Sequence, residues 1–61
     1  MDTADNVARA ARNLITEHGE AAETIALTRA KHAMESKRPT VAQTWLDIAA
    51  AVIRLQGRPG R

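Results

Sequence analysis

Residues 40–56, TVAQTWLDIAAAVIRLQ, constrain the fold more than any other part of this 61-residue chain. Pro39 fixes its own backbone φ and disfavours helical backbone in the residue before it, so a new helix can begin directly after it. Thr40 and Gln43 have the spacing of a capping box, and Gly57 stands where a glycine commonly ends a helix. One helix is therefore predicted over residues 40–56.

This helix is predicted to be apolar over more than half of its circumference. One seam recurs at spacings of four, three, four and three, and consists of Val41, Trp45, Ile48, Val52 and Leu55. Such spacing is typical of a helix that packs along its length against another helix. A second apolar set lies on the adjoining face and consists of Ala42, Leu46, Ala49 and Ile53. A helix of this kind must be covered on two sides.

Two further helices are predicted upstream, over residues 3–18 and 20–36. His18 and Gly19 are expected to end the first, because glycine readily adopts the left-handed backbone that follows a helix. The alternative is that Gly19 lies inside one long helix, at a cost of about 1 kcal/mol relative to alanine. The apolar arc of the second helix consists mostly of alanine. We therefore expect this helix to be the closely packed middle element, in contact with both others.

The expected fold class is all-α, with three short helices in one small bundle. The predicted domain covers residues 1–56, and residues 57–61 are expected to form a disordered basic tail. A chain of this length lies near the lower limit for folding alone. Thirteen of its residues are alanine, and it contains no Phe, Tyr or Cys. Because such a core is thin and has no disulfide, we expect dimerisation or a partner protein to complete the bundle.

Charge and hydropathy limit the classes of partner. The net charge is +2 and the isoelectric point is about 9.9, which is only mildly basic. The longest apolar run, Ile48 to Ile53, is too short to span a bilayer, and the N-terminal sequence MDTADNVARA does not resemble a signal peptide. We expect a cytoplasmic protein with no membrane contact.

The sequence has no pattern that predicts catalysis or metal binding. The two histidines, His18 and His32, are fourteen residues apart, and a zinc site needs three or four converging ligands. Ser36 is the single serine and has no paired base. The carboxylates are spread along faces that are predicted to be exposed. We therefore expect no enzymatic activity, no metal site and no cofactor.

The leading functional hypothesis is a non-enzymatic protein–protein interaction module, either a homodimer or an accessory subunit of a larger complex. It would use the Leu46/Ile53 side of the third helix together with part of the second. The residues expected to form the core or the interface are Trp45, Leu46, Ile48, Val52, Ile53 and Leu55.

The alternative is a small DNA-binding regulator that uses basic residues flanking the third helix. Its candidate phosphate contacts are Lys31, Lys37, Arg38, Arg54 and Arg58. A helix that reads DNA needs several polar side chains on its exposed face, and Asp47 on that face would repel phosphate. The basic residues are also expected in a solvated fringe, which is why this function ranks second.

A sequence pattern also links the chain to other proteins. LI-x-x-HG-x-x-A is formed by Leu14, Ile15, His18, Gly19 and Ala22, and W-x-x-I with a later leucine by Trp45, Ile48 and Leu55. In this pattern, over roughly residues 7–56, the chain resembles a group of small uncharacterised helical proteins from proteobacteria. The resemblance implies a helical fold in which the His18-Gly19 pair ends a helix, and it implies no activity. The chain departs from the group at residues 37–39, Lys-Arg-Pro, where an acidic Gly-Asp turn is expected.

Overall fold

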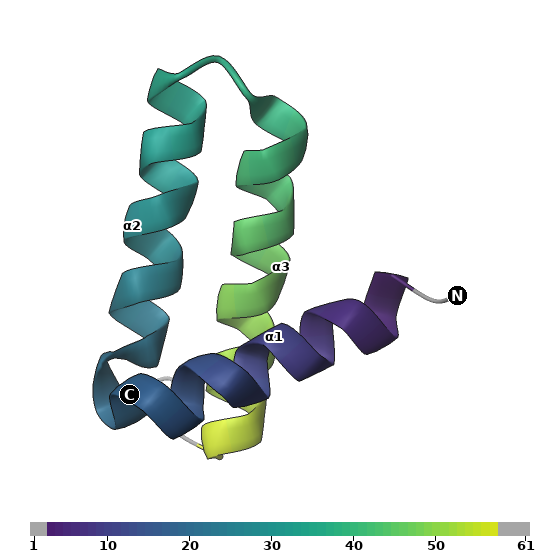
Figure 1. The fold of residues 1–61 in the computed structure, drawn as a ribbon, viewed down its shortest axis with the longest axis vertical. Helices are drawn as coiled ribbons and strands as arrows, with labels where there is room; N and C mark the ends of the chain where they lie inside the picture. The colour runs from purple at the N-terminus through teal and green to yellow at the C-terminus, as the bar shows by residue number, and fades with distance from the viewer. Residues whose placement is uncertain (1–2, 58–61) are drawn as a thin grey trace.

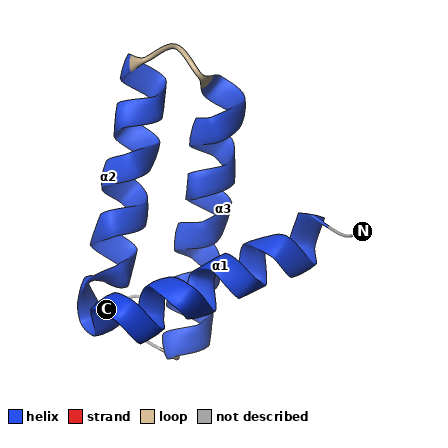
Figure 2. Ribbon diagram, in the orientation of Figure 1, coloured by secondary structure: helices blue, strands red, loops and turns tan. Residues whose placement is uncertain are grey.

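The computed structural model of the chain describes residues 3–57, which form three α-helices and no strand (Figures 1 and 2). Helix α1 spans Thr3–His18, α2 spans Ala22–Glu35 and α3 spans Pro39–Gln56. Helices α2 and α3 lie side by side as an antiparallel hairpin, and α1 crosses the end of the hairpin that is opposite its turn (Figure 1). The predicted all-α class is confirmed. The tail predicted over residues 57–61 lies outside the described residues except for Gly57.

Glycines end two of the helices, as predicted. Gly19 has a φ of 58° and Gly57 a φ of 65°, both in the left-handed region. After α1, a 3-10 turn over Gly19–Ala21 (η1) leads into α2, so the second helix begins two residues later than expected. The Gly19 carbonyl oxygen accepts a hydrogen bond from Gln56 Nε2 at 3.0 Å. This bond ties the turn between α1 and α2 to the C-terminal end of α3.

The start of α3 differs from the prediction. The helix begins at Pro39, which is well tolerated at a first helical position because the N–H that proline lacks would have no partner within the helix. Thr40 therefore lies inside the helix, and its carbonyl oxygen accepts a hydrogen bond from Thr44 Oγ1 at 3.1 Å. Gln43 Nε2 donates to Asp47 Oδ1 at 3.0 Å. The capping box predicted for Thr40 and Gln43 is wrong.

The core is built largely from alanine. The buried side chains of α2 are Ala22, Ala26, Ala30 and Ala33, and those of α3 are Ala42, Ile48, Ala49 and Val52. Helix α1 adds Ala11 and Leu14. Among the described residues, Val52 is the largest side chain that is fully buried. Small side chains let two helices approach closely, but each buries little apolar area.

Helix α3, and not α2, is the central element of the fold. It packs against α2 along the hairpin and against α1, whereas α1 and α2 touch much less. The predicted packing of the third helix on two sides is confirmed, and the middle position predicted for the second helix is wrong. The larger side chains explain this arrangement, because Val7 and Ile15 of α1 pack against the cluster that contains Ile48 and Val52.

The buried line of α3 is displaced from the predicted seam. Val41 and Leu55, at the ends of the seam, are 42% and 45% exposed, whereas Ala42 and Ala49 from the adjoining set are buried. The alanine-lined side of α2 can approach α3 most closely where α3 is also lined by alanine. Assigning Val41 and Leu55 to the packed seam was therefore wrong, while Ile48 and Val52 lie in the core as predicted.

Substitutions of two valines of α3 test whether the fold is stabilised by the observed row of buried residues and not by the predicted seam. Val52→Ala should lower the free energy of unfolding by about 2 kcal/mol, because it leaves a small cavity in a fully buried position. Val41→Ala removes the same atoms from an exposed position and should cost less than about 0.5 kcal/mol. Urea denaturation followed by circular dichroism measures both values. Equal losses would contradict the observed packing.

The turn between α2 and α3 holds a lysine in left-handed backbone. The Arg38 N–H donates to the Ala33 carbonyl at 2.8 Å and the Lys37 N–H donates to the Met34 carbonyl at 3.0 Å. This bond pair is a Schellman motif, in which the left-handed residue is usually glycine. Lys37 occupies that position with a φ of 61°. A side chain there costs roughly 1 kcal/mol of strain.

Lys37→Gly should therefore raise the free energy of unfolding by about 0.5–1 kcal/mol, as glycine removes the strain of the left-handed position. Ser36→Gly is the matched control, since Ser36 has a φ of −88° and glycine there adds only flexibility. Thermal unfolding should show a higher midpoint for the first variant and a lower one for the second. A midpoint for Lys37→Gly at or below that of the unmodified chain would refute the proposed strain.

Candidate interaction surface

Four large apolar side chains of the hairpin remain exposed at regular positions. Leu27 and Met34 are seven residues apart on α2, and Leu46 and Ile53 are seven residues apart on α3. Seven residues make almost two turns, so each pair lies on one line along its helix. In each helix, this line lies about a quarter turn around the helix axis from the row of buried residues. Viewed along each chain from the N-terminal to the C-terminal end, the direction of this quarter turn is the same in α2 and α3.

The two lines lie on the same side of the hairpin. The buried residues of α2 and α3 face each other. Because the two helices are antiparallel, the same quarter turn away from this contact, followed along each chain, reaches the same broad side of the hairpin in both helices. The opposite quarter turn reaches the other broad side of the hairpin, where Ile25 of α2 and Ala51 of α3 lie. These two residues pack against the core together with Val7 and Ile15 of α1. Helix α1 crosses the near side of the hairpin in Figure 1, so the two lines lie on the far side.

We term Leu27, Met34, Leu46 and Ile53 the apolar hairpin face. Their exposed fractions are 44%, 61%, 44% and 37%. Single exposed apolar side chains are common on proteins, but a row of four on one side of a helix pair is typical of a surface that another protein covers. Burying the exposed half of one such side chain contributes about 1 kcal/mol. The face is therefore a candidate interaction surface.

The six residues predicted to form the core or interface do not form a single surface. Ile48 and Val52 are buried, and Trp45 is partly buried against the core. Leu46 and Ile53 belong to the apolar hairpin face. Leu55, seven residues after Ile48, lies by helical register on the same side of α3 as Ile48, and it is exposed at the end of the helix.

The sequence prediction did not name the two α2 residues of this face. The apolar arc of the second helix was expected to pack internally, and Leu27 and Met34 are the large residues beside its alanines. Their spacing of seven residues matches that of Leu46 and Ile53, and they are far larger than the alanines beside them. This match in spacing is the sequence feature from which the two α2 residues of the face could have been predicted.

Trp45 is covered by an arginine of the neighbouring helix. The guanidinium carbon of Arg29 lies 5.2 Å from the centroid of the Trp45 ring, which is the geometry of a cation–π contact. Arg29 also borders a surface groove of about 450 Å³, whose other lining residues are Ile25, Thr28 and His32. All four belong to α2, so this groove is the open flank of one helix and does not enclose a ligand.

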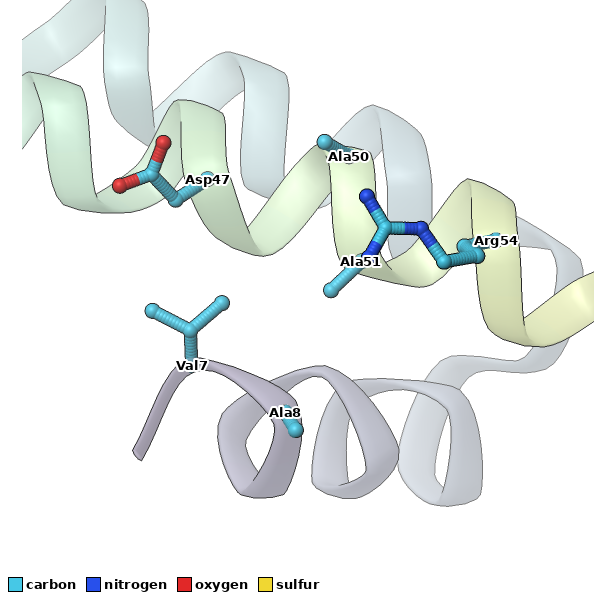
Figure 3. A pocket seen from close by; sticks show the side chains of 6 residues that line it. All are labelled: Val7, Ala8, Asp47, Ala50, Ala51 and Arg54. Carbon is cyan, nitrogen blue, oxygen red and sulfur yellow. The ribbon is translucent and has the colours of Figure 1, made fainter. Parts of the chain in front are cut away.

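A smaller hollow lies in the angle between α1 and α3 (Figure 3). Its volume is about 290 Å³, and its lining residues are Val7, Ala8, Asp47, Ala50, Ala51 and Arg54. Val7 points from α1 toward α3, and the charged groups of Asp47 and Arg54 come from α3 (Figure 3). The Asp47 carboxylate already accepts a hydrogen bond from Gln43. The hollow is near the lower limit for ligand pockets and offers few polar groups to orient a ligand.

The basic residues considered for DNA binding lie at two ends of the hairpin. Lys37 and Arg38 occupy the turn between α2 and α3, and Lys31 lies in the second half of α2. Arg54 lies sixteen residues after Arg38, which corresponds to about 24 Å along the helix axis. Arg58 lies outside the described residues. The described candidates for phosphate contact therefore do not lie together on one surface.

Both histidines are exposed. His18 Nε2 lies 3.8 Å from Glu17 Oε1, and both side chains are well exposed. Within residues 3–57, no group of three or more His, Cys, Asp or Glu side chains is arranged to hold a metal ion. In the same part of the chain, none of the helices combines the length and the apolar character needed to cross a membrane.

Comparisons with protein-family models, with curated proteins and with solved structures gave no match to this chain. The resemblance to small proteobacterial helical proteins, stated above from the sequence pattern, stays a prediction.

Replacing either histidine tests whether it has a structural or ligand-binding role. His18→Ala and His32→Ala should each change the free energy of unfolding by less than about 0.5 kcal/mol, because both side chains are exposed. Chemical denaturation with and without added Zn²⁺ measures this. Loss of the fold in either variant, or stabilisation by zinc that the variant loses, would reveal a role that these positions do not suggest.

Proposed function

We propose that this protein is a non-enzymatic interaction module, and that the apolar hairpin face is the surface through which it binds another protein chain. The observation that carries this proposal is the position of the four exposed large side chains. They form two parallel rows on the side of the hairpin opposite α1. The compartment included in this proposal is the cytoplasm, as expected from the sequence.

The arrangement of the helices explains why this side is left open. The hairpin has two broad sides, and α1 packs against one of them. The described chain has no further helix that could cover the other. An interaction module gains binding energy from such a surface, because a second protein removes its apolar area from water.

A DNA-binding function has less support. Among the candidate phosphate contacts, Lys37 and Arg38 lie at the turn and Arg54 lies at the opposite end of the hairpin, so phosphate contacts would have to reach both ends. The hairpin helices also run side by side (Figure 1), whereas the two helices of a helix-turn-helix motif cross at a large angle. This alternative therefore remains a prediction from the sequence.

The interaction can be tested in the cells that produce the protein. After chemical cross-linking in the cells, the tagged chain should migrate well above its own mass of 6.6 kDa. Leu46→Glu should abolish the larger species, since it places a carboxylate in the centre of the apolar hairpin face. Leu55→Glu is the matched control, because Leu55 is equally exposed but lies on the same side of α3 as Ile48.

An uncomplexed chain in the cells would contradict the proposal. It would equally be contradicted if Leu46→Glu and Leu55→Glu reduced the larger species to the same extent, since the interaction would then not depend on this side of the hairpin.

A further inference from the structure

Building on the proposed function, we propose that the apolar hairpin face binds a second copy of this chain. The two hairpins would pack face to face about a two-fold axis and run antiparallel to each other. Helices α2 and α3 of both copies would then form a four-helix bundle, with α1 on each outer side. The apolar residues, the charged residues beside them and the charge at the ends of the hairpin each support this arrangement.

Three of the four apolar residues of the face, all except Met34 near the turn, can complement themselves. A two-fold interface uses the same patch on both partners, so a side chain on the axis meets itself and any other meets the residue equally far beyond the axis. If α2 crosses its copy at Leu27, the two Leu27 side chains meet at the axis. At nearly the same level on α3, Leu46 of each copy lies opposite Ile53 of the other. Ala50, midway between them, leaves room for close approach.

The charges beside Leu27 fit the same axis. Glu23 precedes Leu27 by four residues and Lys31 follows it by four, so both lie close to the line of the face. Glu23 is half-buried at the edge of the apolar hairpin face, and Lys31 is exposed. In an antiparallel contact centred on Leu27, each Glu23 lies opposite Lys31 of the other copy. The dimer would thus contain two equivalent ion pairs of opposite charge.

The charge at the two ends of the hairpin favours the antiparallel orientation. The turn carries Lys37 and Arg38, whereas the opposite end carries Glu20 and Glu23. A parallel dimer would bring the four basic side chains of the two turns together, and the antiparallel dimer brings each turn to an acidic end. Each end also carries one residue of the other charge, Glu35 near the turn and Arg54 at the opposite end. By helical register, both lie on the outer sides of their helices.

Sedimentation equilibrium of the purified full chain is the first test. We expect a mass of twice 6.6 kDa at micromolar concentration. Ile53→Glu should give a folded monomer, whereas Leu55→Glu should remain a dimer with unchanged helical circular dichroism. A compact, folded monomer for the unmodified chain at all concentrations would overturn the proposal. A dimer unaffected by both Leu46→Glu and Ile53→Glu would also overturn it.

Exchanging the charges of Glu23 and Lys31 tests the antiparallel orientation of the dimer. This test is valid even if the Ile53→Glu variant does not fold. Glu23→Lys alone and Lys31→Glu alone each convert both ion pairs into repulsive pairs, and each should raise the dimer Kd by about tenfold. An equimolar mixture of the two variants should form a heterodimer with restored affinity, because every facing pair is again of opposite charge. A weaker fold in either variant could not produce this recovery. A mixture that associates no better than the separate variants would overturn the antiparallel arrangement.

The two proposals fail in different ways. If the purified chain is a monomer but the cross-linked species in cells persists and depends on Leu46, the interaction module stands and the second copy is not its partner. If neither purified chain nor cells show an assembly, both proposals fail.

Discussion

The close contact between α2 and α3 determines what the rest of the molecule can do. Alanines line this contact on α2, with Ala42 and Ala49 on α3, so most of the side chains between the two helices are small. Large apolar side chains consequently lie on the two broad sides of the hairpin. One side receives α1 through Ile48 and Val52. The other keeps Leu27 and Leu46 exposed to solvent.

The arrangement of the described helices leaves this surface open. Within residues 3–57, no fourth helix lies on the open side, where an ordinary four-helix bundle has one. Here the Gly19 turn directs α1 to one side, and the hydrogen bond from Gln56 to the Gly19 carbonyl holds that turn against the end of α3. A second copy of the hairpin is a suitable cover for the open side, since it has the same dimensions and a complementary order of charges.

Much of the fold could be predicted from the sequence, because its boundaries depend on local backbone chemistry. Gly19 and Gly57 end helices since glycine adopts left-handed backbone without strain, and Pro39 separates α2 from α3. The Thr40 cap was mispredicted because proline can itself open a helix. The left-handed Lys37 could not be foreseen, because lysine is strained in this conformation and this position of a Schellman motif is usually glycine.

The candidate surface was predicted less completely than the fold. Leu46 and Ile53 were assigned to an uncovered side from the third helix alone. Leu27 and Met34 could join them only once the antiparallel pairing of α2 and α3 was known, since the pairing decides which sides of two helices coincide. The burial of Ala42 and Ala49 likewise depends on how closely α2 approaches.

The most direct test of the central claim is hydroxyl-radical footprinting of the chain inside cells, with each rate normalised to that of the unfolded chain. Leu27, Leu46 and Leu55 are exposed to almost the same extent in the single chain, at 44%, 44% and 45%. If the apolar hairpin face is covered by another protein chain, Leu27 and Leu46 should be labelled several-fold less than Leu55. Equal labelling of the three leucines would contradict the claim.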